Sequence, residues 1–294
     1  MIDNNIIETR IAFHQRSCAQ CVDIIFDNLV KMDLLDPKSE FFAESKNRIF
    51  HGYFQSFYPF AEFFIHLPTK SREFFIYNSS LFVAMFFLDQ ALDSLSNTPS
   101  TKVRSFQISS YLFLNYIERL MLKEDSQNIM PIFYNYYREQ TEYLVLEKKW
   151  TYPKLYISKY CNTDRIHKKG ILLLFPFELL SRKIPNEIPD LALIKDMFIN
   201  YFSFITLADD ILDLDDDIRN KCITYPIALH YKQTGKFLEI HEQPKRMLSD
   251  VTAVLSSFQQ NLQNLEREVG KNSLIMNNSL SHLRTGLRKV GIRL

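Results

Sequence analysis

Six aspartates fall within nine positions of the segment FITLADDILDLDDDIRNK, residues 204–221. The formal net charge of the whole chain is only +1, so this local repulsion needs a cause. Clustered carboxylates beside an apolar wall raise one another's pKa unless cations lie among them. Oxygen-only ligand sets suit hard cations such as Mg²⁺ and Mn²⁺. The segment therefore indicates a cation site, and a solvated acidic helix end is the simpler alternative.

A second row of carboxylates stands on a separate apolar segment, LFVAMFFLDQALDSL, which carries Asp89 and Asp93. A step of four residues advances a helix by slightly more than one turn, so Asp89 and Asp93 share a face. The same holds for Asp209 and Asp213, and for Asp217 if the helix lasts that long. Two such rows facing each other could hold several Mg²⁺ ions with a diphosphate between them.

Apolar side chains precede each carboxylate row at helical spacing. They are Phe82, Met85 and Phe86 before Asp89, and Phe198 and Phe202 before Asp209. Each of them alone is as easily an ordinary core residue. Together they predict an apolar cavity with a charged rim.

The elements that must position these residues are all expected to be helices. Only 6 of the 294 residues are glycine, which sheet proteins need at many turns and bulges. Apolar residues recur at i, i+3, i+4 and i+7 between Pro, Asn, Ser and Gly breaks. The expected helices lie near 6–32, 39–66, 71–96, 101–123, 128–149, 154–160, 164–183, 188–214, 222–232, 243–269 and 272–291.

The same pattern predicts a single domain over residues 1–294, an all-α helical bundle with a central active-site cavity. The chain shows neither a low-complexity linker nor an internal repeat. The helices at 71–96 and 188–214 are the most apolar, so they are expected at the centre.

Bulk composition excludes several classes of protein. The balance of 35 basic and 34 acidic residues argues against a nucleic-acid binder. The longest charge-free apolar run, 74–88, is too short to span a membrane, and the first residues do not form a signal peptide. The four cysteines offer no complete zinc motif and are expected to be reduced thiols. We therefore expect a cytoplasmic protein without a membrane span.

Two quoted motifs carry a resemblance to a known superfamily. DDILD at 209–213, followed by DIRNKCITYP at 217–226, resembles the second aspartate-rich motif of the class I isoprenoid synthases, which include trans-prenyl diphosphate synthases and class I terpene synthases. DQALD at 89–93 is similar to their first motif, with Gln90 in place of an aspartate; the role of Gln90 is left open. KKG at 168–170 and Glu139-Gln140 are similar to shorter motifs of the superfamily.

The resemblance implies a reaction class. Neither a Gly-Gly-Lys motif before Asp89 nor an Arg pair after Asp93 is present, and both serve chain elongation in the superfamily. The chain thus looks most like a bacterial terpene synthase that ionises a farnesyl- or geranylgeranyl-type diphosphate and then cyclises or eliminates. A chain-elongating or head-to-head prenyltransferase and a non-catalytic prenyl-binding member of the same fold remain alternatives.

Roles for individual residues follow from the resemblance. Asp89, Asp93, Asp209 and Asp213 would be the catalytic metal ligands, joined by Asp217, around three Mg²⁺ ions or Mn²⁺ in their place. The diphosphate-binding candidates are Lys168, which matches best, and Lys169, Arg165, Arg219 and Lys221. The aromatic cavity residues would stabilise a carbocation. A homodimer is also implied.

Overall fold

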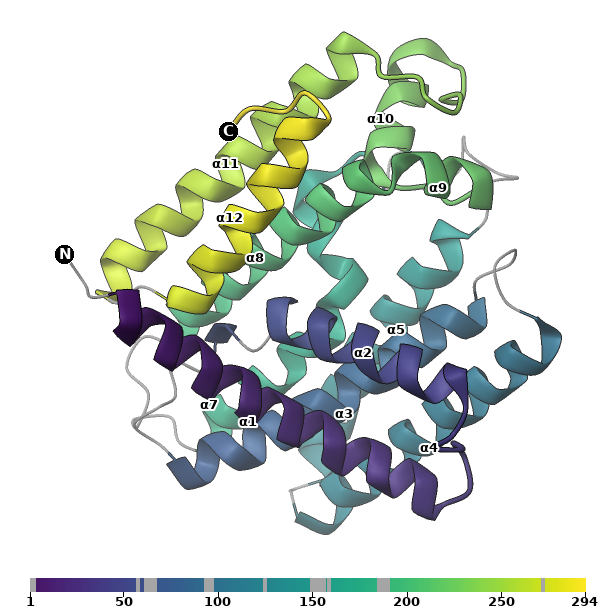
Figure 1. The fold of residues 1–294 in the computed structure, drawn as a ribbon, viewed down its shortest axis with the longest axis vertical. Coiled ribbons are helices and arrows are strands. Elements are labelled where there is room, and N and C mark those ends of the chain that lie inside the picture. Colours follow the sequence, from purple (N-terminus) through teal and green to yellow (C-terminus); the bar gives the residue numbers. More distant parts are fainter. Residues whose placement is uncertain are drawn as a thin grey trace.

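A computed structural model of the chain describes residues 4–56, 59–60, 68–92, 98–123, 126–148, 157, 160–183, 191–270 and 273–294. Within these ranges the fold is helical throughout, and the all-α prediction is confirmed (Figure 1). The helices are α1 (Asn4–Lys31), α2 (Glu40–Ser56), α3 (Pro68–Leu92), α4 (Pro99–Lys123), α5 (Ser126–Glu147), the 3₁₀ helix η2 (Thr163–Leu174), α7 (Phe175–Lys183), α8 (Leu191–Leu212), α9 (Leu214–Asn220), α10 (Tyr225–Thr234), α11 (Lys245–Val269) and α12 (Leu274–Lys289).

Two of the expected helices are each divided in the structure. The segment 164–183 forms η2 and then α7, with non-helical backbone angles at Gly170 (φ −129°, ψ 23°). The segment 188–214 ends as α8 at Leu212, and α9 begins at Leu214. Most of the expected helix at 154–160 lies outside the described residues, as do the ends of those expected at 39–66 and 71–96.

Helix α8 is buried nearly all round, as its sequence predicts. All eight successive residues 201–208 are buried, and a run of that length covers every face of a helix. It packs against α11, η2 and α12, and Figure 1 shows α11 and α12 lying along it. Among the described residues only α8 is long and apolar enough to cross a membrane, but half of that stretch is buried in the protein. A core helix has the same properties, so this is weak evidence for a span.

Helix α3 is the second central helix and pairs along its length with α4. It also contacts α1, α2, α5, α7 and η2. One continuous apolar core runs from Cys18 on α1 to Ile292 after α12. Through this packing the last turns of α3 and α8, with Asp89 and Asp209, reach the same cavity.

Candidate active site

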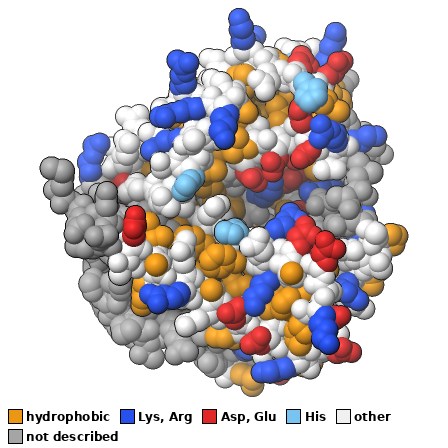
Figure 2. Space-filling view, viewed as in Figure 1, with side chains coloured by type: hydrophobic (Ala, Val, Ile, Leu, Met, Phe, Trp, Pro, Cys, Tyr) orange, Lys and Arg blue, Asp and Glu red, His pale blue; other side chains and the backbone are white. Residues whose placement is uncertain are grey.

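A cavity of about 300 Å³ lies between α2, α3, α5, η2, α8 and α12. This volume is at the lower end of the range for small-molecule pockets. Figure 2 shows acidic and basic side chains gathered around a hollow on this face of the molecule. The cavity is lined by Gly52, Gln55, Ser56, Phe82, Met85, Phe86, Asp89, Gln140, Leu144, Lys169, Leu173, Phe202, Ile205, Thr206, Asp209 and Leu283.

Four of the five predicted apolar wall residues line this cavity: Phe82, Met85 and Phe86 from α3, and Phe202 from α8. Phe198 does not line it. Its ring stacks on Phe202 with a centroid separation of 5.6 Å and an interplanar angle of 19°. Phe198 therefore supports the wall from behind.

The two carboxylate rows contribute one described residue each to the cavity, Asp89 from α3 and Asp209 from α8. Asp93 lies outside the described residues. Burial raises the pKa of Asp209; attraction to Lys169 opposes this increase and repulsion from Asp89 adds to it. The two carboxylates are therefore close enough to repel each other across the cavity.

Asp213 and Asp217 lie beyond the end of α8 and do not line the cavity, although the backbone N–H of Asp213 still donates to the carbonyl oxygen of Asp209 at 2.9 Å. Asp213 has φ −100° and ψ 15°, precedes α9, and is exposed to solvent. Asp217 is half-buried, and burial followed by repulsion from Asp210 raises its pKa to about 8. Asp217 thus lies near the buried charges described below. Asp213 lies near Asp209, and partial desolvation followed by repulsion from Asp209 raises the pKa of Asp213.

Only one of the five predicted basic residues lines the cavity, and it is Lys169 rather than Lys168. Lys168 pairs instead with Glu139 at 2.7 Å. Arg219 pairs with Asp216 at 2.5 Å on the surface. The two others, Arg165 and Lys221, lie half-buried and exposed outside the cavity lining.

The backbone of the KKG segment, residues 168–170, is held by Gln140 and packs closely against Phe202, which explains why a glycine is needed at position 170. The amide of Gln140 donates to the carbonyl oxygen of Lys169 and accepts from the backbone N–H of Leu172 at 3.3 Å. A Cβ on Gly170 would meet the ring of Phe202 at 2.2 Å. Only a residue without a side chain lets η2 approach α8 this closely.

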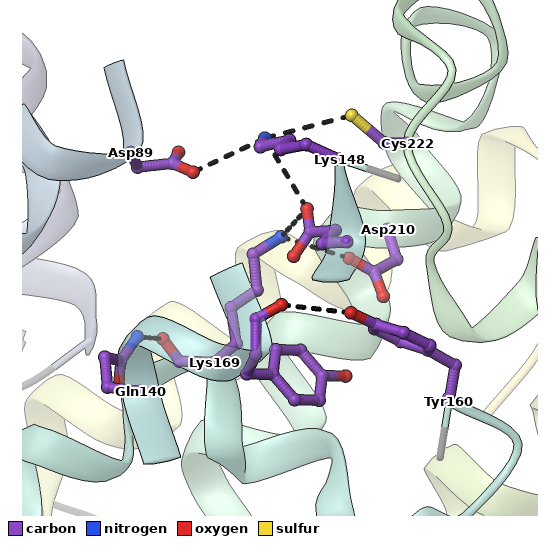
Figure 3. A network of polar contacts seen from close by, with 9 residues as sticks. Asp89, Gln140, Lys148, Tyr160, Lys169, Asp210 and Cys222 are labelled. Carbon is purple, nitrogen blue, oxygen red and sulfur yellow. Dashed lines mark hydrogen bonds and ion pairs between the residues drawn. The ribbon is translucent and has the colours of Figure 1, made fainter. Parts of the chain in front are cut away.

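A row of alternating charges crosses the rim of the cavity (Figure 3). Lys169 Nζ lies 3.5 Å from Asp210 Oδ1 and 3.4 Å from Glu147 Oε1. Lys148 Nζ lies 3.7 Å from the same Glu147 oxygen and 3.4 Å from Asp89 Oδ1. The row therefore links α3, α5, η2 and α8 through two lysines and three carboxylates.

Asp210, one of the two buried carboxylates of this row, is costly to ionise. Desolvation raises the pKa of Asp210 to about 7; attraction to Lys169 and a hydrogen bond from the backbone N–H of Tyr225 oppose the shift, and repulsion from Glu147 and Asp209 adds to it. The pKa of Lys169 is raised well above its ordinary value by Glu147, Asp210, Asp217 and Asp89, although burial opposes this. Lys169 therefore stays positively charged in the folded protein.

The interpretation of the sequence missed Glu147 and Lys148 entirely and gave Asp210 no role. A signal was present on α5, because Gln140, Leu144 and Glu147 are spaced i, i+4 and i+7 and so share one helix face. A carboxylate on a face that also carries apolar residues points inward and needs a cation partner.

The described side chains fit a magnesium site only in part. No group of three or more His, Cys, Asp or Glu among them is placed to hold a metal ion. Mg²⁺, however, usually takes one or two carboxylates plus phosphate oxygens and water. Asp89 Oδ1 is buried and accepts no hydrogen bond from the described residues, but Lys148 Nζ lies 3.4 Å from it, so a metal ion on this oxygen would compete with that ion pair. The donor set thus suits an ion that arrives with a phosphate-bearing ligand.

No family model matches the chain, and no curated protein or solved structure matches it significantly.

Proposed function

We propose that this protein is a magnesium-dependent class I terpene synthase, which ionises an allylic prenyl diphosphate and releases diphosphate. The observation that carries the proposal is one cavity with an aromatic wall and with carboxylates from two different helices, Asp89 and Asp209, on its lining. The wall suits an isoprenoid chain, and the carboxylates suit the cations that accompany a diphosphate.

Each part of the cavity has a task in this reaction. Asp89 and Asp209 would hold magnesium, which would neutralise the charge developing on the leaving diphosphate oxygens. Lys169, the cation that lines the cavity, would donate hydrogen bonds to the same oxygens. Its charge is secured by Glu147 and Asp210.

The apolar wall would guide the organic cation that remains after diphosphate leaves. The rings of Phe82, Phe86 and Phe202 line the cavity, and each desolvated aromatic face stabilises a cation by roughly 0.5–2 kcal/mol. Leu173, Ile205 and Leu283 exclude water that would otherwise quench the cation.

The test is incubation of the purified full chain with geranyl, farnesyl and geranylgeranyl diphosphate, with Mg²⁺ and with EDTA. Diphosphate release is measured by a coupled assay, and products are identified by gas chromatography with mass spectrometry. We expect a terpene hydrocarbon or alcohol only in the presence of Mg²⁺. Release of no diphosphate from any of the three substrates would overturn the proposal.

Two further reactants separate the alternatives. Added isopentenyl diphosphate would yield a longer prenyl diphosphate if the protein were a chain-elongating enzyme. Equilibrium binding of the substrates without turnover would identify a non-catalytic prenyl-binding protein. Ion pairs already occupy the carboxylates of Asp89 and Asp210, which makes this second alternative the one to exclude first.

A further inference from the structure

Lys148, which directly follows α5, has no task in the proposed reaction although its ammonium group lies 3.4 Å from a carboxylate oxygen of the cavity residue Asp89. Its Nζ is 3.4 Å from Asp89 Oδ1 and 3.7 Å from Glu147 Oε1, and it donates to Cys222 Sγ at 3.8 Å (Figure 3). Only 14% of the side chain is exposed, so these groups rather than water surround the charge.

The two lysines of the charge row are held differently. Lys169 lies between two carboxylates, Glu147 and Asp210, that are 3% and 7% exposed. Lys148 shares Glu147 at a longer distance and also attracts Asp217, and its carboxylate partner Asp89 is 39% exposed. The contact of Lys148 with Asp89 Oδ1 is an ion pair without hydrogen-bond geometry. Because Asp89 is far more exposed than Glu147 and Asp210, water screens this pair more than the pairs of Lys169, and it is the easier one to exchange.

A divalent cation on Asp89 would compete directly with this ammonium. Both would approach the same carboxylate, and like charges a few ångströms apart repel strongly in a partly buried site. Lysine carries a compact charge on a flexible stem, so Nζ can move to a new anionic partner nearby. A diphosphate in the cavity would be such a partner.

We propose that Lys148 is the counter-cation of Asp89 that a divalent cation must displace, and that its ammonium then pairs with the substrate diphosphate. This inference rests on the proposed metal–diphosphate role of Asp89. Metal and diphosphate then bind cooperatively. A metal ion that binds alone loses the Lys148–Asp89 ion pair without replacement, whereas a bound diphosphate forms a new ion pair with the displaced ammonium.

The experiment measures binding of Mn²⁺ alone to the purified full chain, by electron paramagnetic resonance of the free ion. The K148M variant removes the charge and keeps the length of the stem, so we expect it to bind Mn²⁺ at least ~tenfold more tightly than the wild type. K148R keeps the charge and should bind as weakly as the wild type. K46M is the matched control, because it removes a lysine paired with Asp23 on α1 and should change nothing.

A second arm uses inorganic pyrophosphate in equilibrium dialysis at one fixed concentration of free Mn²⁺. Here K148M should bind about fivefold or more weakly than the wild type, because the displaced ammonium is missing as a partner. Tighter binding of Mn²⁺ alone together with weaker binding of pyrophosphate by K148M would show that Lys148 moves from Asp89 to the diphosphate. Unchanged or weaker Mn²⁺ binding by K148M, or unchanged pyrophosphate binding, would overturn the inference.

Neither arm requires turnover, so an inactive protein can still show the exchange, and an active one can fail to show it. Circular dichroism and thermal unfolding of K148M are measured first, with K148Q as a second neutral variant. Failure of both neutral variants to fold would assign Lys148 a structural role and would also overturn the inference.

Discussion

A Cβ atom on Gly170 would stand 2.2 Å from Cζ of Phe202. The ring of a cavity-wall residue on α8 thus lies directly against the backbone of η2. Gly170 is also the neighbour of Lys169, whose carbonyl is held by Gln140. The apolar wall and the cavity lysine are therefore parts of one packed unit, and disturbing one should displace the other.

The substitution Gly170→Ala tests this contact. Because no real Cβ is found so close to another atom, either the Phe202 ring or η2 must move, and overpacking of this kind costs about 1–3 kcal/mol. Urea unfolding should show that loss of stability. Combining Gly170→Ala with Phe202→Leu should cost less than the sum of the two single changes, since the smaller side chain relieves the clash.

Gly286→Ala is the matched control for this prediction. A Cβ there would meet only flexible side-chain atoms of Leu212 at 3.3 Å, and alanine favours a helix over glycine by about 1 kcal/mol. We expect its unfolding free energy to equal or exceed that of the wild type. An equal loss in both variants would show that the contact with Phe202 is not special.

Lys169→Met and Lys168→Met should differ in stability although the residues are adjacent. Lys169→Met leaves the buried carboxylates of Glu147 and Asp210 without their shared cation, and breaking a buried ion pair from one side costs about 3–5 kcal/mol. Lys168→Met removes a half-exposed pair with Glu139, worth about 0–1 kcal/mol. Chemical unfolding at neutral pH measures both. Equal losses would contradict the buried row of charges.

Stability should fall as pH rises through the weakly acidic range. Burial raises the pKa of Asp210 from 3.8 to about 7, so between these values the folded chain keeps a proton that the unfolded chain releases. The free energy of unfolding then decreases with rising pH, by up to about 1.4 kcal/mol per pH unit for this one group. The pH series is measured by urea unfolding in EDTA.

Asp210→Asn should flatten this slope. The part that remains belongs to the other carboxyls whose pKa burial raises: Asp217, to about 8, and Asp209, Asp213 and Glu266. Asp215→Asn is the control. A hydrogen bond from the backbone N–H of His241 lowers the pKa of Asp215, so its contribution is lost only as pH falls below that range. A wild-type slope in Asp210→Asn would contradict the assignment.

The helical pattern of the sequence predicted the fold class and the central position of α8, because periodic apolar residues reflect burial directly. It also predicted that Phe82, Met85, Phe86 and Phe202 line a cavity, since i, i+3 and i+4 spacing fixes a helix face. Both predictions depend only on which face of a single helix is apolar, so they do not require knowledge of the helix packed against it.

Predictions that required knowledge of partners fared differently. The motif favours Lys168 over Lys169, but motif spacing does not determine which of the two side chains reaches the cavity. The hydrogen bond from Gln140 to the carbonyl oxygen of Lys169 fixes the backbone there and so orients both side chains. Asp213 lies next to Asp209, as the spacing predicts, but α8 ends at Leu212 and Asp213 does not line the cavity. Glu147 and Lys148 were missed because their meaning depends on ion pairs across helices.

The central claim is that Asp89 and Asp209 act together on a magnesium-bound diphosphate, although they come from helices far apart in the sequence. The most direct measurement is Mg²⁺-dependent diphosphate release from the best allylic substrate by Asp89→Asn, Asp209→Asn and Asp216→Asn. Asp216 belongs to the same acidic segment but is exposed and paired with Arg219. We predict that the first two variants lose at least ~100-fold in rate, equivalent to about 2.7 kcal/mol, while Asp216→Asn keeps wild-type activity. Wild-type turnover by either Asp89→Asn or Asp209→Asn, with folding intact, would contradict the claim.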